Sequence, residues 1–120
     1  METHRLVLPA DLNQYGFLFG GQLLSWIDEA SWIAATLDYP GCHFVTVGLD
    51  KVEFRHSVRE GTILSIQSEL VKEGATSVTY GVTVRRGRCD TGEVLFSTHV
   101  TFVNVDASGG KIPIGSTKEE

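Results

Sequence analysis

The sequence predicts an α+β domain in which one long helix is wrapped by a curved antiparallel sheet of about five strands. Three observations predict this fold class. One stretch, from Gly20 to about Asp38, repeats apolar residues at helical spacing. The segments that follow alternate apolar and polar residues, which is typical of strands with one buried face. The connections between these segments are short and contain glycine, which favours antiparallel neighbours.

The helix is expected to begin at Gly20-Gly21 and to end before Pro40-Gly41, since glycine and proline mark such boundaries. Its apolar stripe should face the core. The stripe consists of Leu23, Ile27, Ala30, Ala34 and Leu37, widened by Trp26 and Ile33. Asp28 lies off this stripe, about 140° round the axis from Leu23. It therefore lies on a flank of the helix, at the border of the buried surface.

The strands are expected after the helix, with one more before it. Residues 43–54, 62–72, 77–85 and 93–105 are strand-like, and 5–8 is a possible fifth strand. A curved sheet around the helix would bury the apolar face of both. Such a domain leaves edge strands and a helix flank uncovered, which oligomerisation would protect.

Length and composition suit a single domain over residues 1–120, with a loosely ordered tail after about 107. No apolar run approaches the length of a membrane helix, so membrane insertion is not expected. The first residues lack the features of a signal peptide, which predicts a cytoplasmic protein. The formal net charge of -5 argues against nucleic acid as a partner.

Metal chemistry is not expected from the cysteines and histidines. Cys42 and Cys89 form no CxxC pair, and the four histidines are scattered, so no zinc spacing is present and both thiols are expected to be free. Two basic clusters are candidate sites for a polyanionic ligand, or else ordinary solvated loops. They are Arg55-His56 with Arg59, and Arg85-Arg86-Gly87-Arg88.

The candidate chemistry lies in residues 13–30, because the chain has no GxSxG, P-loop or GxGxxG motif. Gly20-Gly21 opens the helix, so unpaired backbone N–H groups there can stabilise an oxyanion. Asp28 supplies a carboxylate, and Asn13 supplies an amide with a donor and an acceptor. This set suffices to hydrolyse an activated acyl group. The alternative is a glycine-rich loop beside an ordinary solvated aspartate.

One motif in this segment carries a resemblance to a known family. The pattern Asn-x-x-Gly-x-x-Phe-Gly-Gly, followed by Trp-Ile-Asp-Glu-Ala, resembles the acyl-CoA thioesterases of the hot-dog fold. It is most similar to the bacterial short- and medium-chain acyl-CoA hydrolases and the brain-type acyl-CoA hydrolases. The likeness continues through residues 50–58, 74–78 and 101–106.

The resemblance implies a role for each matching residue. Asp28 would be the catalytic carboxylate, Asn13 would orient the water or the carbonyl, and Gly20 and Gly21 would hold the thioester carbonyl. Contacts with coenzyme A would come from Arg55, His56, Ser57, Gly74, Thr76 and Ser77. Ser57 stands where proline is common, and Ala75 where a larger residue is common.

The resemblance also implies the reaction and the assembly. The enzyme would be a thioester hydrolase that converts acyl-CoA to free acid and coenzyme A, with Asp28 as base or as nucleophile. No metal or cofactor would be needed, since coenzyme A is part of the substrate. The chain would form a homodimer, with the two catalytic residues from opposite subunits, and further a hexamer as a trimer of dimers.

Two other functions belong to different classes. A hot-dog dehydratase acting on hydroxyacyl thioesters would carry a histidine where this chain has Asn13, and an amide cannot move a proton near neutral pH. A non-catalytic acyl-CoA sensor would not need both Asn13 and Asp28, and no DNA-binding element is visible in the sequence.

Overall fold

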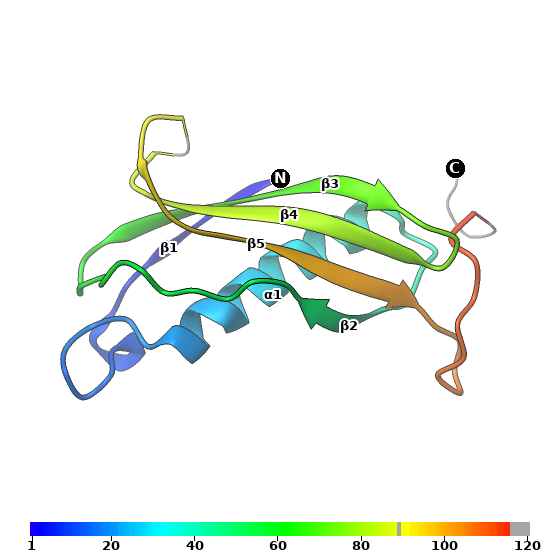
Figure 1. The fold of residues 1–120 in the computed structure, drawn as a ribbon, viewed down its shortest axis with the longest axis horizontal. Helices are drawn as coiled ribbons and strands as arrows, with labels where there is room; N and C mark the ends of the chain where they lie inside the picture. Colours follow the sequence, from blue (N-terminus) through cyan, green and yellow to red (C-terminus); the bar gives the residue numbers. More distant parts are fainter. Residues whose placement is uncertain (89, 116–120) are drawn as a thin grey trace.

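The computed structural model describes residues 1–88 and 90–115 and contains one long helix and five strands. The strands are β1 (Glu2–Leu6), β2 (Phe44–Leu49), β3 (Ile63–Glu73), β4 (Ser77–Arg86) and β5 (Glu93–Asn104). Helix α1 spans Gly20–Asp38, and a short 3-10 helix, η1, spans Pro9–Asp11. All strand pairs are antiparallel, in the order β1-β3-β4-β5-β2. The sheet curves around α1 (Figure 1), so the predicted α+β fold class is confirmed.

The core lies between α1 and the inward face of the sheet. Strand β4 alternates as its sequence predicts, with Val78, Tyr80, Val82 and Val84 buried. On the helix, the predicted stripe is buried from Leu23 to Ala34 except for Ile33, which is only partly buried. The prediction is wrong for Leu37, which is 67% exposed because Tyr39, just past the helix, takes the core position at this end.

Strand β2 is shorter than the sequence predicts. It ends at Leu49, and residues 50–57 continue in an extended path without regular strand pairing. The register of β2 against β5 shifts between Thr46 and Gly48, which is a β-bulge. After the bulge and the early end of β2, the following segment continues beside β5 toward the end of the sheet where α1 begins (Figure 1).

The first part of the tail expected after about residue 107 packs against the domain. Ile114 is fully buried, and its amide donates to the carbonyl of Ala75 (2.8 Å). Asn104 is also fully buried; its side chain accepts from the amide of His43 (2.8 Å) and donates to the carbonyl of Pro113 (3.4 Å). Residues 116–120, the remainder of the predicted tail, and Cys89 lie outside the described residues. Cys42 is buried in the core.

None of the helices in residues 1–88 and 90–115 is long and apolar enough to span a membrane. The same residues contain no group of three or more His, Cys, Asp or Glu side chains placed to hold a metal ion.

Asn104→Ala tests the two hydrogen bonds by which Asn104 holds His43 and Pro113 at this end of the sheet. The substitution leaves the amide of His43 without its acceptor, which should lower the free energy of unfolding by about 1–3 kcal/mol. Ser108→Ala removes an exposed hydroxyl bonded to Asp106 and should change it by less than about 0.5 kcal/mol. Urea unfolding of both variants measures the difference, and equal stabilities would contradict the assigned role of Asn104.

Candidate active site

The start of α1 presents unpaired backbone N–H groups, as the sequence predicts. The carbonyl of Phe19 accepts from the amides of Gln22 (3.0 Å) and Leu23 (3.1 Å). Within the described residues no acceptor is bonded to the amides of Gly20 and Gly21, and Phe19 contributes no side-chain cap. These two donors, at the positive end of the helix dipole, are available to an oxygen that carries negative charge.

Asp11 fixes this helix start against the preceding chain. The side-chain amide of Gln22 donates to Asp11 Oδ1 (2.8 Å), and the amide of Leu8 donates to Asp11 Oδ2 (2.8 Å). The bond from Gln22 is the main reason why the pKa of the Asp11 carboxyl lies below its usual range, with the Leu8 amide second. The amide of Phe19 also donates to the carbonyl of Asp11 (2.9 Å). The helix start is therefore held in place before any substrate arrives.

The ring of Phe54 packs closely on Gly20. A Cβ atom at Gly20 would lie 3.1 Å from two ring carbons of Phe54. That ring stacks on Phe96 of β5, with centroids 5.4 Å apart and planes 12° apart. Phe54 thus couples the helix start to the segment that carries Arg55, His56 and Ser57.

Asn13 shapes the glycine loop with one end of its side chain. Its Oδ1 atom accepts from the amides of Tyr15 (2.9 Å) and Phe17 (3.1 Å). The amide Nδ2 is left as the chemically available end, because no acceptor among the described residues bonds to it. Asn13 can therefore donate to a substrate oxygen or a water, but its oxygen is already in use.

A cavity of about 250 Å³ brings several predicted site residues together. It is lined by Asn13, Phe17, Leu18, Gly20, Leu23, Phe54, His56, Ser57 and Val58. Asn13, a helix-start glycine and two of the predicted coenzyme A contacts thus share one space.

Asp28 does not line this cavity. It lies about 12 Å further along the helix than Gly20, on the flank that faces β2. Its Oδ1 atom accepts from the hydroxyl of Thr46 (2.7 Å). Thr46 was not predictable from the sequence, because a threonine inside a strand pattern gives no sign that its hydroxyl meets a helix eighteen residues earlier. This bond orients the carboxylate, and Oδ2 has no bonded donor among the described residues.

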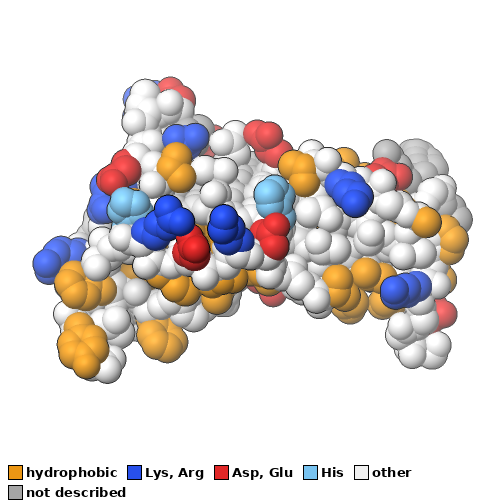
Figure 2. All heavy atoms as spheres, in the orientation of Figure 1, with side chains coloured by type: hydrophobic (Ala, Val, Ile, Leu, Met, Phe, Trp, Pro, Cys, Tyr) orange, Lys and Arg blue, Asp and Glu red, His pale blue; other side chains and the backbone are white. Residues whose placement is uncertain are grey.

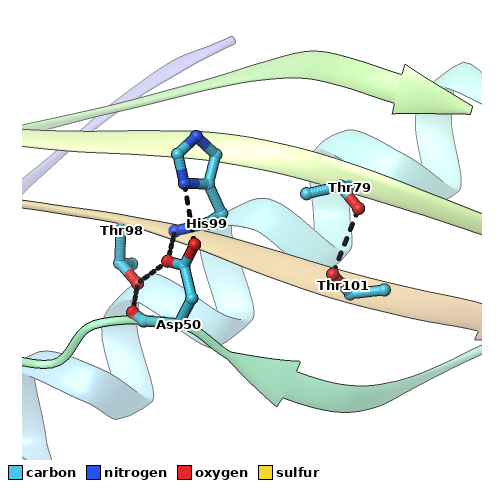
Figure 3. Close-up of polar contacts among 5 residues, drawn as sticks. All are labelled: Asp50, Thr79, Thr98, His99 and Thr101. Carbon is cyan, nitrogen blue, oxygen red and sulfur yellow. Dashed lines mark hydrogen bonds and ion pairs between the residues drawn. The ribbon is translucent and has the colours of Figure 1, made fainter.

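The segment after β2 is anchored by Asp50 (Figure 3). The backbone amide of His99 donates to Asp50 Oδ1 (2.8 Å), and this bond is the main reason why the pKa of Asp50 lies below its usual range. Asp50 Oδ2 lies 3.1 Å from His99 Nδ1, and the hydroxyl of Thr98 donates to the Asp50 carbonyl. The carboxylate replaces the carbonyl that a continuing strand would offer to β5, which is why β2 ends here.

His56 and Arg86, one from each basic cluster of the sequence, share an acidic neighbour, Glu93. Glu93 Oε1 is 3.3 Å from Arg86 Nε, and Glu93 Oε2 is 3.7 Å from His56 Nδ1. Arg55 is paired with Glu53 (2.5 Å to Oε1). Figure 2 shows the resulting mixture of basic, acidic and histidine side chains on this face.

A second hollow, of about 280 Å³, lies beside this mixed group. It is lined by Lys51, Glu53, Arg55, His56, Val94, Leu95, Phe96 and Ser97. Arg59 instead stacks its guanidinium on Phe17, 4.8 Å from the ring centroid, and so helps to hold the glycine loop. Basic side chains are therefore present here, but Arg55, His56 and Arg86 each have an acidic neighbour.

The remaining predicted contacts with coenzyme A lie at the opposite end of the sheet. Gly74 and Thr76 are in the turn between β3 and β4, and Ser77 begins β4 (Figure 1). Ser77 pairs with Val103 near the end of β5, whereas Glu93, beside His56, begins that strand. The two ends are about 30 Å apart. Within one chain, Gly74, Thr76 and Ser77 are not brought to the cavity that holds His56 and Ser57.

Comparison with known proteins identifies the family of this chain. Residues 15–93 match the model of the thioesterase superfamily. A solved hexameric hotdog fold thioesterase of Campylobacter jejuni is 38% identical, with a TM-score of 0.78, over 92% of this chain and 86% of that one. The chain therefore belongs to the thioesterase superfamily and has the hot-dog fold.

Two further relatives are named as an acyl-CoA thioester hydrolase and an acyl-coenzyme A thioesterase. An uncharacterized acyl-CoA thioester hydrolase of Bacillus subtilis is 30% identical over 90% of this chain, and the match spans 63% of the Bacillus protein. Mouse acyl-coenzyme A thioesterase 11 is 32% identical over 70% of this chain, which is 14% of its own length. The chain thus spans less than two thirds of these curated relatives.

A second solved relative carries a ligand. The acyl-CoA hydrolase of Staphylococcus aureus, in complex with butyryl coenzyme A and coenzyme A, is 28% identical with a TM-score of 0.84, over 94% of this chain and 70% of that one. Structures of that enzyme also include an aspartate-to-alanine and an asparagine-to-alanine variant, at positions fifteen residues apart.

Gly20→Ala tests the contact between the helix start and Phe54. The added methyl group must displace the stacked ring, and with it the segment 55–57, so thioesterase turnover should fall about tenfold or more. Gly21→Ala is the matched control: it keeps the backbone N–H, and its methyl group meets only Phe19, which stacks on no other ring among the described residues, so turnover should stay within a few-fold of the parent. Equal losses in both variants would show that the contact with Phe54 has no special role.

Proposed function

We propose that this protein hydrolyses acyl-CoA thioesters to a free acid and coenzyme A. The observation that carries the proposal is the shared cavity, which Asn13 and Gly20, the first residue of the helix, line together with His56 and Ser57. Asp28, with Oδ1 held by Thr46 and Oδ2 available, supplies the carboxylate. Asn13 and Asp28 are fifteen residues apart, the same spacing as the two positions substituted in the Staphylococcus enzyme.

The proposed reaction follows from the charges that these groups can stabilise. Water attacks the thioester carbonyl while Asp28 accepts its proton, and the amides of Gly20 and Gly21 stabilise the oxyanion. The carbon–sulfur bond then breaks, and the thiolate of coenzyme A takes up the proton. Alternatively, Asp28 attacks the carbonyl itself and forms a mixed anhydride that water hydrolyses. Both routes need only water and acyl-CoA, with no metal or cofactor.

A complete site requires two subunits in this proposal. Asp28 lies on the helix flank beside the edge strand β2, away from the cavity that contains Asn13. Val45 and Val47 on β2 are exposed apolar residues on an unpaired strand edge, which favours pairing with a second copy. A dimer joined there would place the Asp28 flank of one subunit against the cavity of its partner.

Further assembly would complete the coenzyme A site. The turn with Gly74, Thr76 and Ser77 lies too far from His56 to share a ligand within one chain, so another subunit would supply it. A hexamer built from dimers satisfies this requirement, and the solved relative from Campylobacter is hexameric. The cytoplasm stays the expected location.

Local positive charge would hold the phosphates of coenzyme A. The chain is acidic overall, with a formal net charge of -5, so the general field opposes the ligand. Lys51, Arg55 and His56 lie around one hollow, and they are the proposed contacts at this end of the sheet.

Asp28→Asn tests the proposal. The substitution keeps the shape of the side chain but removes its charge and basicity, so turnover of acyl-CoA should fall at least about a hundredfold. The thiol released from acetyl- and butyryl-CoA is measured colorimetrically, and circular dichroism checks that the variant is folded. A parent protein that binds acyl-CoA without releasing thiol would instead be a sensor. Hydration of an unsaturated acyl-CoA by the parent would indicate a dehydratase.

A further inference from the structure

Trp32 lies one turn beyond Asp28 on the same flank of α1. Four residues separate them, which places Trp32 about 6 Å further along the axis and about 40° round from Asp28. The side chain of Trp32 is partly exposed, at 40%, whereas the other tryptophan, Trp26, is buried in the core. A large aromatic surface thus lies open beside the proposed catalytic carboxylate.

A hydrogen bond fixes the indole ring. Trp32 Nε1 donates to the backbone carbonyl of Phe44 on β2 (3.0 Å). Asp28 is bonded to Thr46, two residues further along the same strand. One short stretch of β2 therefore orients both the carboxylate and the indole, so their relative positions are preset.

The indole of Trp32 provides an apolar surface for the acyl group. The thioester carbonyl must lie against Asp28, and the alkyl chain that leaves it needs an apolar surface within a few ångströms. On the side of Asp28 that faces away from the helix start, Trp32 presents that surface, because Ala35 on the following turn is fully buried. The indole would block an acyl chain that extends along this flank, and its hydrogen bond to the Phe44 carbonyl holds the ring in one orientation.

We infer that Trp32 closes the acyl pocket and restricts the enzyme to short acyl groups, of about two to four carbons. This inference rests on the proposed function and deepens it by naming the substrate class. Trp32 acts here by steric exclusion and takes no part in the chemical step. Pockets discriminate a single methylene by about tenfold or more, so one wall is enough to set the preference.

The test is a panel of acyl-CoA substrates from acetyl to octanoyl, assayed by thiol release. The parent should hydrolyse acetyl- and butyryl-CoA best. Trp32→Ala opens the pocket, so the ratio of kcat/KM for octanoyl-CoA to that for butyryl-CoA should rise at least about tenfold. Trp32→Leu should shift the ratio in the same direction and serves if the alanine variant does not fold. Trp32→Phe keeps most of the ring and should leave the preference for short chains in place.

Leu37→Ala is the matched control. Leu37 is a large exposed apolar residue of the same helix, about 180° round the axis from Asp28. Its removal should leave the substrate profile unchanged. If Trp32→Ala and Trp32→Leu both keep the parent's ratio, or if the parent already prefers octanoyl-CoA, the inference is overturned while the proposed function stands. A parent that hydrolyses none of the panel overturns the proposed function, and the inference with it.

Discussion

The packing of α1 against the inward face of the sheet is the contact on which the other features depend. The helix buries Leu23, Trp26, Ile27, Ala30 and Ala34 against a sheet whose order puts β1 and β2 at its edges. With one face of the helix buried in this way, Asp28 is left on the flank beside β2, where Thr46 reaches it. The same packing leaves the start of the helix at one end of the sheet, with its N–H groups exposed. Position, not an unusual local environment, makes these groups candidates for catalysis.

The second constraint is the early end of β2. Because the Asp50 carboxylate takes the amide of His99, strand pairing stops and the chain crosses toward the helix start. There Phe54 packs on Gly20 and stacks on Phe96, and His56 and Ser57 enter the cavity that contains Asn13. One carboxylate–amide contact on the outer face thus positions the residues proposed to hold coenzyme A.

The features that depend on sequence period were predictable, and those that depend on distant contacts were not. Helix α1 has the predicted limits, because its apolar period and its flanking glycine and proline are local signals. The end of β2 at Leu49 was missed, because it depends on a bond between Asp50 and His99. The burial of Ile114 was missed for the same reason: its partner, Ala75, lies far away in the sequence. At the site, the motif predicts Asn13 and Asp28 as candidates, and the family resemblance implies that they come from opposite subunits, but the role of Thr46 follows only from the fold.

In the proposed dimer, one active site combines Asn13 of one subunit with Asp28 of another. Mixing the variants Asn13→Ala and Asp28→Asn, each nearly inactive alone, tests this shared site directly. After co-refolding, dimers of one subunit of each kind contain one intact site. Random pairing should therefore restore about a quarter of the parent's turnover. Activity no greater than the sum of the two separate variants would contradict the claim and place both residues in a site within a single chain.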